Sequence, residues 1–224
     1  MSPTSIADRT AHILETLPAG VLLVAAAKTR TPQEVEAAIR GGVTAVGHNY
    51  VQEAERMIAE LGSRAKWHLI GHLQRNKAKK AVALFDMIET LDSWRLAQAI
   101  DRHAADMGKM MPVLVEINSG KESSKTGILP QEVDDFVRKV SELPSIRVEG
   151  LMTMGPRFGD PEDARPYFRH TKAAFERLKK ANIPNAQMRW LSMGMSNTFE
   201  IAIEEGANIV RIGTKLFGDR AEGA

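Results

Sequence analysis

Short apolar runs rich in Val, Ile and Leu recur along the chain, and each is followed by a polar stretch with helical spacing. Such runs indicate buried strands, and their alternation with helices indicates βαβ units and a parallel sheet. After a helix predicted around residues 4–17, the runs predict strands at 21–27, 45–48, 67–71, 87–91, 112–117, 147–152, 189–191 and 208–212. This number of strands favours a closed (β/α)8 barrel, because open doubly wound sheets usually contain fewer.

Helix-starting residues lie between these runs, which supports the alternation. They are Thr31-Pro32, Asp92-Ser93, Pro130, Asp160-Pro161 and Ser196. No linker or low-complexity segment divides the chain, and its length of 224 residues is usual for one barrel. We therefore expect an α/β fold with a single barrel domain over residues 1–224 and an extra N-terminal helix.

Composition and charge exclude several function classes. The 30 basic and 28 acidic residues leave a net charge of +2, which does not suggest a nucleic-acid partner. The absence of cysteine excludes disulfides, thiolate metal sites and a cysteine nucleophile, and it fits a reducing compartment. The apolar runs are too short to span a membrane, and the N-terminus does not resemble a signal peptide. We expect a cytoplasmic protein.

Functional side chains of a barrel project from the carboxyl ends of its strands. Here those ends carry Lys28, His48 with Asn49, Gly71 with His72, Asn118, Thr153, Ser192 and Arg211. Lys28 follows the most apolar strand, so we expect its side chain to emerge from a desolvated interior. Desolvation favours the neutral amine, which is the nucleophile for imine formation. A solvated loop lysine is the alternative reading.

Two neighbouring turns are predicted to bind an anion. Ser196 lies just after the seventh strand, where its hydroxyl and the amides of a helix start would face a phosphate. Gly213 and Thr214 form a similar turn after the eighth strand. For either turn alone, a simple helix cap or turn glycine explains the residues equally well.

Arg211 lies two residues before Gly213, so we expect its side chain to point into the barrel mouth. There it would donate to the pyridine nitrogen of a cofactor and keep that nitrogen unprotonated, which weakens the ring as an electron sink. A surface salt bridge is the alternative role.

With these residues in place, the chain resembles the pyridoxal phosphate homeostasis protein family, whose fold is similar to the barrel domain of alanine racemase. The resemblance lies in segments 24–29, 47–53, 67–77, 150–154, 191–196, 211–214 and 217–220, with Asn118, Glu122, Lys125 and Gly127 between them. These ordered matches extend through nearly the whole chain.

The resemblance implies pyridoxal 5′-phosphate as cofactor, Lys28 as the Schiff-base lysine and Arg211 at the pyridine nitrogen. It implies Ser196, Gly213 and Thr214 around the phosphate and Asn49 near the ring. Ser192 and Met195 complete the expected cofactor-binding set. Members of the family resemble cofactor carriers and regulators of vitamin B6 balance, with no established catalytic turnover. We therefore expect no catalytic residue. We expect apo forms of pyridoxal-phosphate enzymes as recipients of the cofactor.

Three positions depart from the family pattern. His48 stands where the family usually has Glu, Thr198 where it has an acidic residue, and Lys215 where it has a small one. We expect these changes to alter the polarity of the mouth and the strength of phosphate binding, and to leave the roles of Lys28 and Arg211 intact.

The main alternative is a racemase-like enzyme with weak activity. Racemisation needs a base on each face of the substrate, and the similar racemases supply one from a second, β-rich domain that we do not expect here. Metal ligation by His68 and His72 is disfavoured because Gly71 breaks the helix that would pair them.

Lys125 raises a separate question, because its loop after the fifth strand would let it take the cofactor in transit or leave it solvated. Cofactor transfer that is unchanged in Lys125→Ala would exclude the transit role. The sequence is compatible with a monomer or a weak homodimer.

Overall fold

The strands close into a parallel barrel in the computed structural model, which describes residues 5–120, 126–156 and 159–218. Each strand pairs with the next, and the last pairs with the first. The strands are β1 (Leu22–Ala26), β2 (Ala45–His48), β3 (Lys66–Leu69), β4 (Met87–Leu91), β5 (Met111–Ile117), β6 (Ile146–Thr153), β7 (Ala186–Ser192) and β8 (Ile209–Ile212). The predicted barrel is confirmed.

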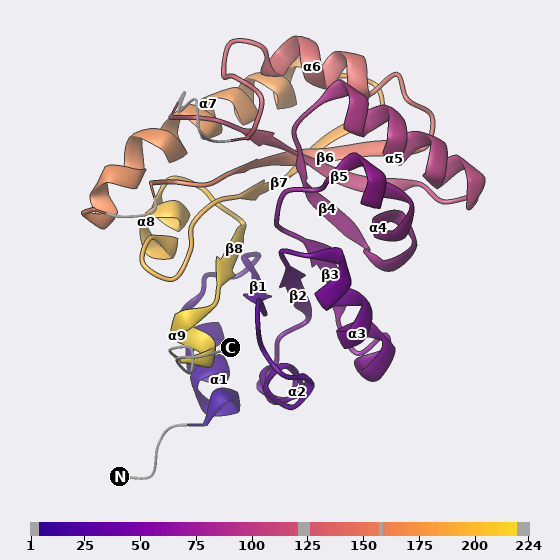
Figure 1. Cartoon of the computed structure of the whole chain (residues 1–224). Coiled ribbons are helices and arrows are strands. Elements are labelled where there is room, and N and C mark those ends of the chain that lie inside the picture. The colour runs from indigo at the N-terminus through magenta and orange to yellow at the C-terminus, as the bar shows by residue number, and fades with distance from the viewer. Residues whose placement is uncertain (1–4, 121–125, 157–158, 219–224) are drawn as a thin grey trace.

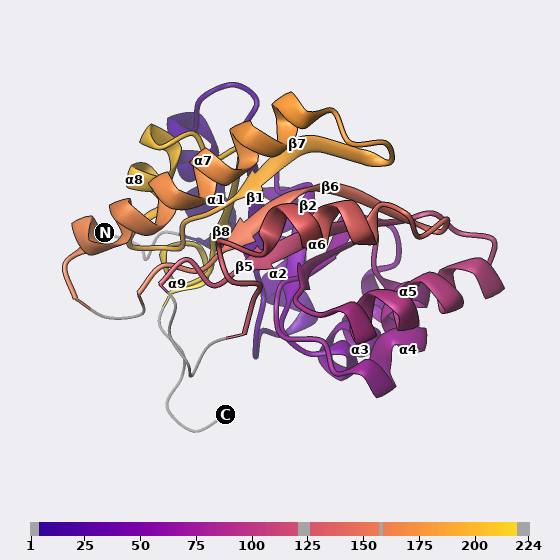
Figure 2. The ribbon, with the colours of Figure 1, turned by 90° about the horizontal axis from the view of Figure 1, so that it is seen from above.

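Helices form the outer layer. They are α1 (Ile6–Thr16), α2 (Pro32–Arg40), α3 (Val51–Leu61), α4 (Ala78–Leu84), α5 (Trp94–Asp106), α6 (Val133–Val140), α7 (Arg165–Ala181), α8 (Phe199–Glu204) and α9 (Thr214–Phe217), with short 3-10 helices η1 (Arg75–Lys77) and η2 (Pro161–Ala164). Seen from above, α3, α4 and α5 gather on one side of the molecule, and α7 and α8 on the other (Figure 2).

Helix starts follow the predicted capping residues in three of five cases. Thr31 caps α2 in a capping box with Glu34, Ser93 precedes α5, and Asp160 caps η2, which leads into α7. The prediction at Pro130 is early, because the chain first makes a turn and α6 begins only at Val133. The prediction at Ser196 is also early, because α8 begins only at Phe199.

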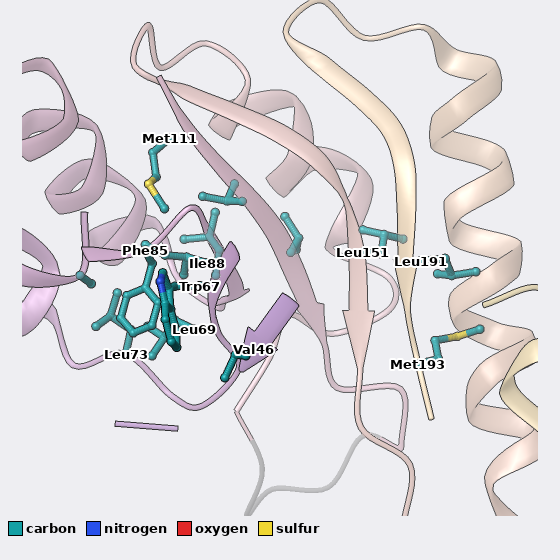
Figure 3. Close-up of a cluster of buried hydrophobic side chains, with 14 of the residues drawn as sticks. Val46, Trp67, Leu69, Leu73, Phe85, Ile88, Met111, Leu151, Leu191 and Met193 are labelled. Atoms are coloured by element: carbon teal, nitrogen blue, oxygen red, sulfur yellow. The ribbon is translucent and has the colours of Figure 1, made fainter. Parts of the chain in front are cut away.

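Strand side chains alternate between two cores. Leu22, Val24 and Ala26 of β1 face a cluster inside the barrel, whereas Leu23 and Ala25 face a larger core between barrel and helices. Phe85 and Trp67 are among the buried side chains of that larger core that Figure 3 shows. The inward set of each strand therefore determines what reaches the mouth.

The largest difference from a predicted strand boundary is at the start of β7, and it arises because the outer face of that strand is polar. β7 begins at Ala186 and not at 189, and its first residues alternate between exposed Gln187 and Arg189 and buried Met188. A run with exposed charge is not recognised as part of an apolar strand.

The N-terminal helix completes the outer layer next to the last described helix, α9. α1 begins with a capping box between Ser5 and Asp8 and lies beside α2 and α9 (Figure 1). Arg9 donates from Nε to the carbonyl of Leu216 over 2.8 Å. The helix is therefore attached to both the first and last units of the barrel.

Candidate functional site

Lys28 continues the inward series of β1. β1 ends at Ala26, and its alternation, with Val24 and Ala26 facing the interior and Ala27 in the outer core, predicts the inward side for position 28 if it is continued beyond the strand. The side chain is half-buried rather than enclosed, and its Nζ lies 5.4 Å from the centre of the Tyr50 ring. The amine is therefore at the open end of the barrel, in contact with an aromatic face.

Arg211 lies below that amine, on the inside of β8. Its backbone is paired level with Val24, and its side chain is only 4% exposed. The guanidinium donates from Nη2 to the carbonyl of Thr153 over 2.9 Å and from Nη1 to the hydroxyl of Ser192. Since a guanidinium has five N–H donors, further ones remain for a ligand.

A buried carboxylate holds this arginine from the opposite wall. Glu89 of β4 accepts a 2.6 Å hydrogen bond from the Ser192 hydroxyl, and its Oε2 lies 3.8 Å from Nη1 of Arg211. Its Oε1 lies 2.7 Å from Nδ1 of His68. Burial alone would raise the pKa of Glu89, but the bond to His68 and the charges of His68 and Arg211 lower it overall.

The guanidinium is affected in the complementary way. Burial lowers the pKa of Arg211, and the negative charges of Glu89 and Glu116 offset part of that effect. An arginine nevertheless stays protonated in proteins, so the floor of the mouth carries one fixed positive charge. The alternative of a surface salt bridge is wrong for this residue, because the side chain is buried.

A second carboxyl inside the barrel lacks a complete set of partners. Glu116 of β5 accepts a 3.1 Å hydrogen bond from Thr126 at Oε1, while its buried Oε2 has no partner among the described residues. Burial raises the pKa of Glu116, which favours the protonated form.

The two predicted anion-binding turns are in direct contact. Gly213 donates its backbone N–H to the hydroxyl of Ser196 over 3.2 Å. The helix after them begins at Phe199 and not beside Ser196, because Thr198 is the capping position and its hydroxyl accepts from the N–H of Met195 over 3.1 Å. The amides around Ser196 therefore belong to a turn that precedes α8.

The other predicted site residues differ in depth. Asn49 is half-buried at the end of β2, where a Cβ on Gly71 would lie 2.5 Å from its carbonyl oxygen. Only glycine allows this close approach. Met195 is half-buried and Thr214 exposed, whereas Ser192 is fully buried beneath them. The Ser192 hydroxyl already donates to Glu89 and accepts from Arg211, so it orients the arginine.

The three departures from the family pattern have separate structural settings. His48 faces the outer side of the wall, with its ring centre 6.0 Å from that of Trp67, so its expected effect on the polarity of the mouth is wrong. Thr198 occupies the N-cap position of α8 without a side-chain capping bond, because its hydroxyl accepts from the N–H of Met195. Lys215 lies 3.7 Å from Glu200 and over the ring of Phe199, beside the two predicted anion-binding turns. Lys125 and Glu122 lie outside the described residues.

His68 and His72 are bound to different carboxylates. His68 contacts Glu89 inside the barrel, and Nδ1 of the exposed His72 lies 2.9 Å from Asp92 at the rim. Within the described ranges, no cluster of three or more His, Asp or Glu side chains is arranged to hold a metal ion. The helices of the same ranges include none with the length and apolar character of a membrane span.

Glu89 and Glu116 are the site residues that the sequence reading missed. Each is the single charged residue of its strand, at the spacing of the inward face. A charge at an inward position of a barrel strand must be paired or bind a ligand, and that signal would have identified both residues.

Known proteins match this chain over most of its length. The profile of the alanine racemase N-terminal domain family matches residues 3–221. Pyridoxal phosphate homeostasis proteins of Aquifex aeolicus and Pongo abelii are 40% and 38% identical to it over 199 and 211 residues. The matches cover 88% of this chain in both cases, and 86% and 76% of the respective relatives.

Solved structures give the same result. PipY of Synechococcus elongatus PCC7942, with PLP bound, superposes with a TM-score of 0.87 at 34% identity, covering 96% of this chain and 100% of PipY. An alanine racemase of Clostridium difficile 630 has a TM-score of 0.80 at 16% identity, over 97% of this chain and 56% of the racemase, which shows the fold alone. This chain belongs to the pyridoxal phosphate homeostasis protein family.

Proposed function

We propose that this protein binds pyridoxal 5′-phosphate at the mouth of the barrel and acts in pyridoxal phosphate homeostasis as a carrier rather than as an enzyme. The observation that carries the proposal is the alignment of Lys28, above buried Arg211, with the joined turns of Ser196 and Gly213. When bound, the cofactor supplies an aldehyde that reacts with amines and a ring that withdraws electrons.

The residues fit the three chemical parts of this cofactor. Lys28 supplies an amine for the aldehyde, and Arg211 has N–H groups to spare for the ring nitrogen. The Ser196 hydroxyl accepts from the amide of Gly213 over 3.2 Å, which leaves its own O–H to donate to a phosphate oxygen. Asn49, Met195 and Thr214 complete the proposed lining. The unpartnered Glu116 oxygen marks a polar group inside the barrel that a ligand would satisfy.

The arginine also supports a carrier role. A permanently charged donor opposite the ring nitrogen keeps that nitrogen unprotonated, which disfavours removal of a proton from a bound amino acid. Glu89 and Ser192 hold Arg211 in this position. We propose that the site contains no catalytic residue, that the protein is cytoplasmic, and that apo forms of pyridoxal-phosphate enzymes are its partners.

The absorption spectrum of the purified protein tests the binding proposal. We expect a band near the visible edge that disappears on borohydride reduction and is missing in Lys28→Ala. Lys66→Ala is the matched control, because Lys66 is exposed at the start of β3, at the opposite end of the barrel. A Lys28→Ala protein that keeps the band would exclude Lys28 as the covalent residue.

An activity assay tests the carrier proposal separately. Purified protein is incubated with several L-amino acids, and formation of the D-enantiomer is followed by chiral chromatography. We expect no racemisation beyond that of free pyridoxal phosphate. Rapid racemisation that Lys28→Ala abolishes would instead establish the racemase-like alternative.

A further inference from the structure

A cavity of about 450 Å³ lies outside the barrel wall, between the start of α2 and the face of α3. Ala27 and Thr29 contribute to its lining, whereas Lys28 between them does not. The cavity is therefore separate from the barrel mouth. Its volume is that of a small-molecule site.

Two polar side chains in this cavity lack partners within the described part of the chain. His48 is 1% exposed, and neither ring nitrogen has a hydrogen bond. Glu53 lies in the first turn of α3, and its buried Oε2 is also unpaired. Each such group carries a desolvation cost of about 1–3 kcal/mol unless something in the cavity satisfies it.

The protonation state of the imidazole restricts what it binds. Burial lowers the pKa of His48 to about 4, so the ring is neutral at physiological pH. A neutral imidazole has one N–H donor and one acceptor nitrogen. The acceptor nitrogen of His48 and the carboxylate of Glu53 both accept hydrogen bonds, so together they favour a ligand group with several N–H donors.

The remaining charges of the lining are balanced. Glu53 and Glu60 are acidic, Arg30 and Arg56 are basic, and the buried side chain of Met57 gives an apolar wall. Arg30 is already paired with Glu34 over 3.1 Å, whereas Arg56 is exposed on α3. A lining with both signs of charge is complementary to a small molecule that carries both an ammonium and a carboxylate.

We propose that this cavity is a second ligand site, which binds a free α-amino acid with its ammonium between His48 and Glu53 and its carboxylate toward Arg56. The side chain of the amino acid packs against Met57. The site does not involve Lys28, so it stands or fails independently of the proposed cofactor function. Its occupant contacts Thr29, the residue after Lys28, from behind the barrel wall.

Isothermal titration calorimetry with borohydride-reduced holoprotein tests the proposal, because reduction prevents an added amine from reacting at Lys28. If the purified protein carries no cofactor, the same titration is made without reduction. The probes are L-methionine, its methyl ester and N-acetyl-L-methionine. We expect saturable binding of L-methionine, and binding of both derivatives weakened by about tenfold or more, since each lacks one charge.

Variants locate the binding. Glu53→Gln and His48→Leu are expected to weaken L-methionine binding by about tenfold or more. Glu55→Gln is the matched control on α3, where Glu55 pairs with Lys80 over 2.6 Å outside the cavity, and its affinity stays unchanged. Absence of saturable heat, or equal affinity in all variants, overturns the proposal. A soaked crystal with only water on His48 and Glu53 does the same.

Discussion

Glu89 is enclosed between the imidazole of His68 and the guanidinium of Arg211, with 0% of its surface exposed. Removing one member of a buried charge set leaves the others without compensation, which costs more than the set itself contributes. This residue therefore affects stability as well as the orientation of the arginine.

We predict that Glu89→Leu lowers the free energy of unfolding by about 3–5 kcal/mol. Glu89→Leu combined with Arg211→Leu should cost less than the sum of the two single changes, because neither charge is then left unpaired. Urea unfolding of the four proteins measures the coupling. The exposed pair of Lys80 and Glu55 is the control and should show about 1 kcal/mol or less. Additive costs at Glu89 and Arg211 would contradict the network.

His48 gives a prediction about pH. Its pKa is about 4 in the folded protein and about 6.5 when unfolded, so the unfolded state takes up the proton first as the pH falls. Stability is therefore unaffected by this residue above about pH 6.5 and decreases between about pH 6.5 and pH 4, by up to about 3 kcal/mol. The wild type and the His48→Leu variant share the other charged groups around the cavity, which are Glu53, Glu60, Arg30 and Arg56.

His48→Leu removes this contribution. The loss of unfolding free energy between about pH 7.5 and pH 4.5, measured by urea titration, should be smaller in the variant than in the wild type. Equal losses would show that the imidazole is protonated in the folded protein over this range.

At the scale of elements, the turn between β7 and α8 depends on a glycine. Gly194 has a φ of +88°, and a Cβ there would lie 2.6 Å from the Cβ of Ala202 and 2.9 Å from the Cα of Phe199. Its carbonyl also accepts the N–H of Arg211 over 3.1 Å. The turn that carries Ser196 is therefore packed directly on α8.

Gly194→Ala has a matched control in Gly20→Ala, because Gly20 has the same φ of +88° and no atom within 4 Å of the added Cβ. Gly20→Ala should cost about 1 kcal/mol from backbone strain alone. Gly194→Ala should cost about 1–3 kcal/mol more, from overpacking, and should weaken pyridoxal phosphate binding. Urea unfolding and cofactor titration measure both effects. Equal stabilities would show that α8 moves freely away from the turn.

Elements with regular periodicity were predictable from sequence, whereas the turns were not. The apolar runs predicted every strand of the barrel, because most strand positions are buried on one face or the other and are therefore apolar. The start of α8 was misplaced because Ser and Thr both favour the N-cap position. Thr198 is the N-cap residue, whereas the hydroxyl of Ser196 contacts Gly213, which is distant in sequence. The alternation of side chains along β2 predicts that His48 faces outward. The site prediction did not apply this alternation to the residues at the strand ends.

At the scale of the whole molecule, closure of the barrel joins β1 to β8 in register, so no strand of the described sheet has a free edge. We predict a single cooperative unfolding transition. Trp67 in β3, Trp94 in α5 and Trp190 in β7 report on separated parts of the barrel. Tryptophan fluorescence and far-ultraviolet circular dichroism should give coincident urea transitions. Two separated transitions would show that the chain is not one folding domain.

The pairing of β1 with β8 also places a condition on synthesis of the protein. Lys28 lies just beyond the first strand and Arg211 in the last, and these strands become neighbours only when the chain closes. A nascent chain that has not yet released β8 from the ribosome lacks both the arginine and the glycine turn. Under the proposed function, prematurely terminated products therefore contain the proposed Schiff-base lysine without the groups proposed to retain the cofactor, and they should not capture it.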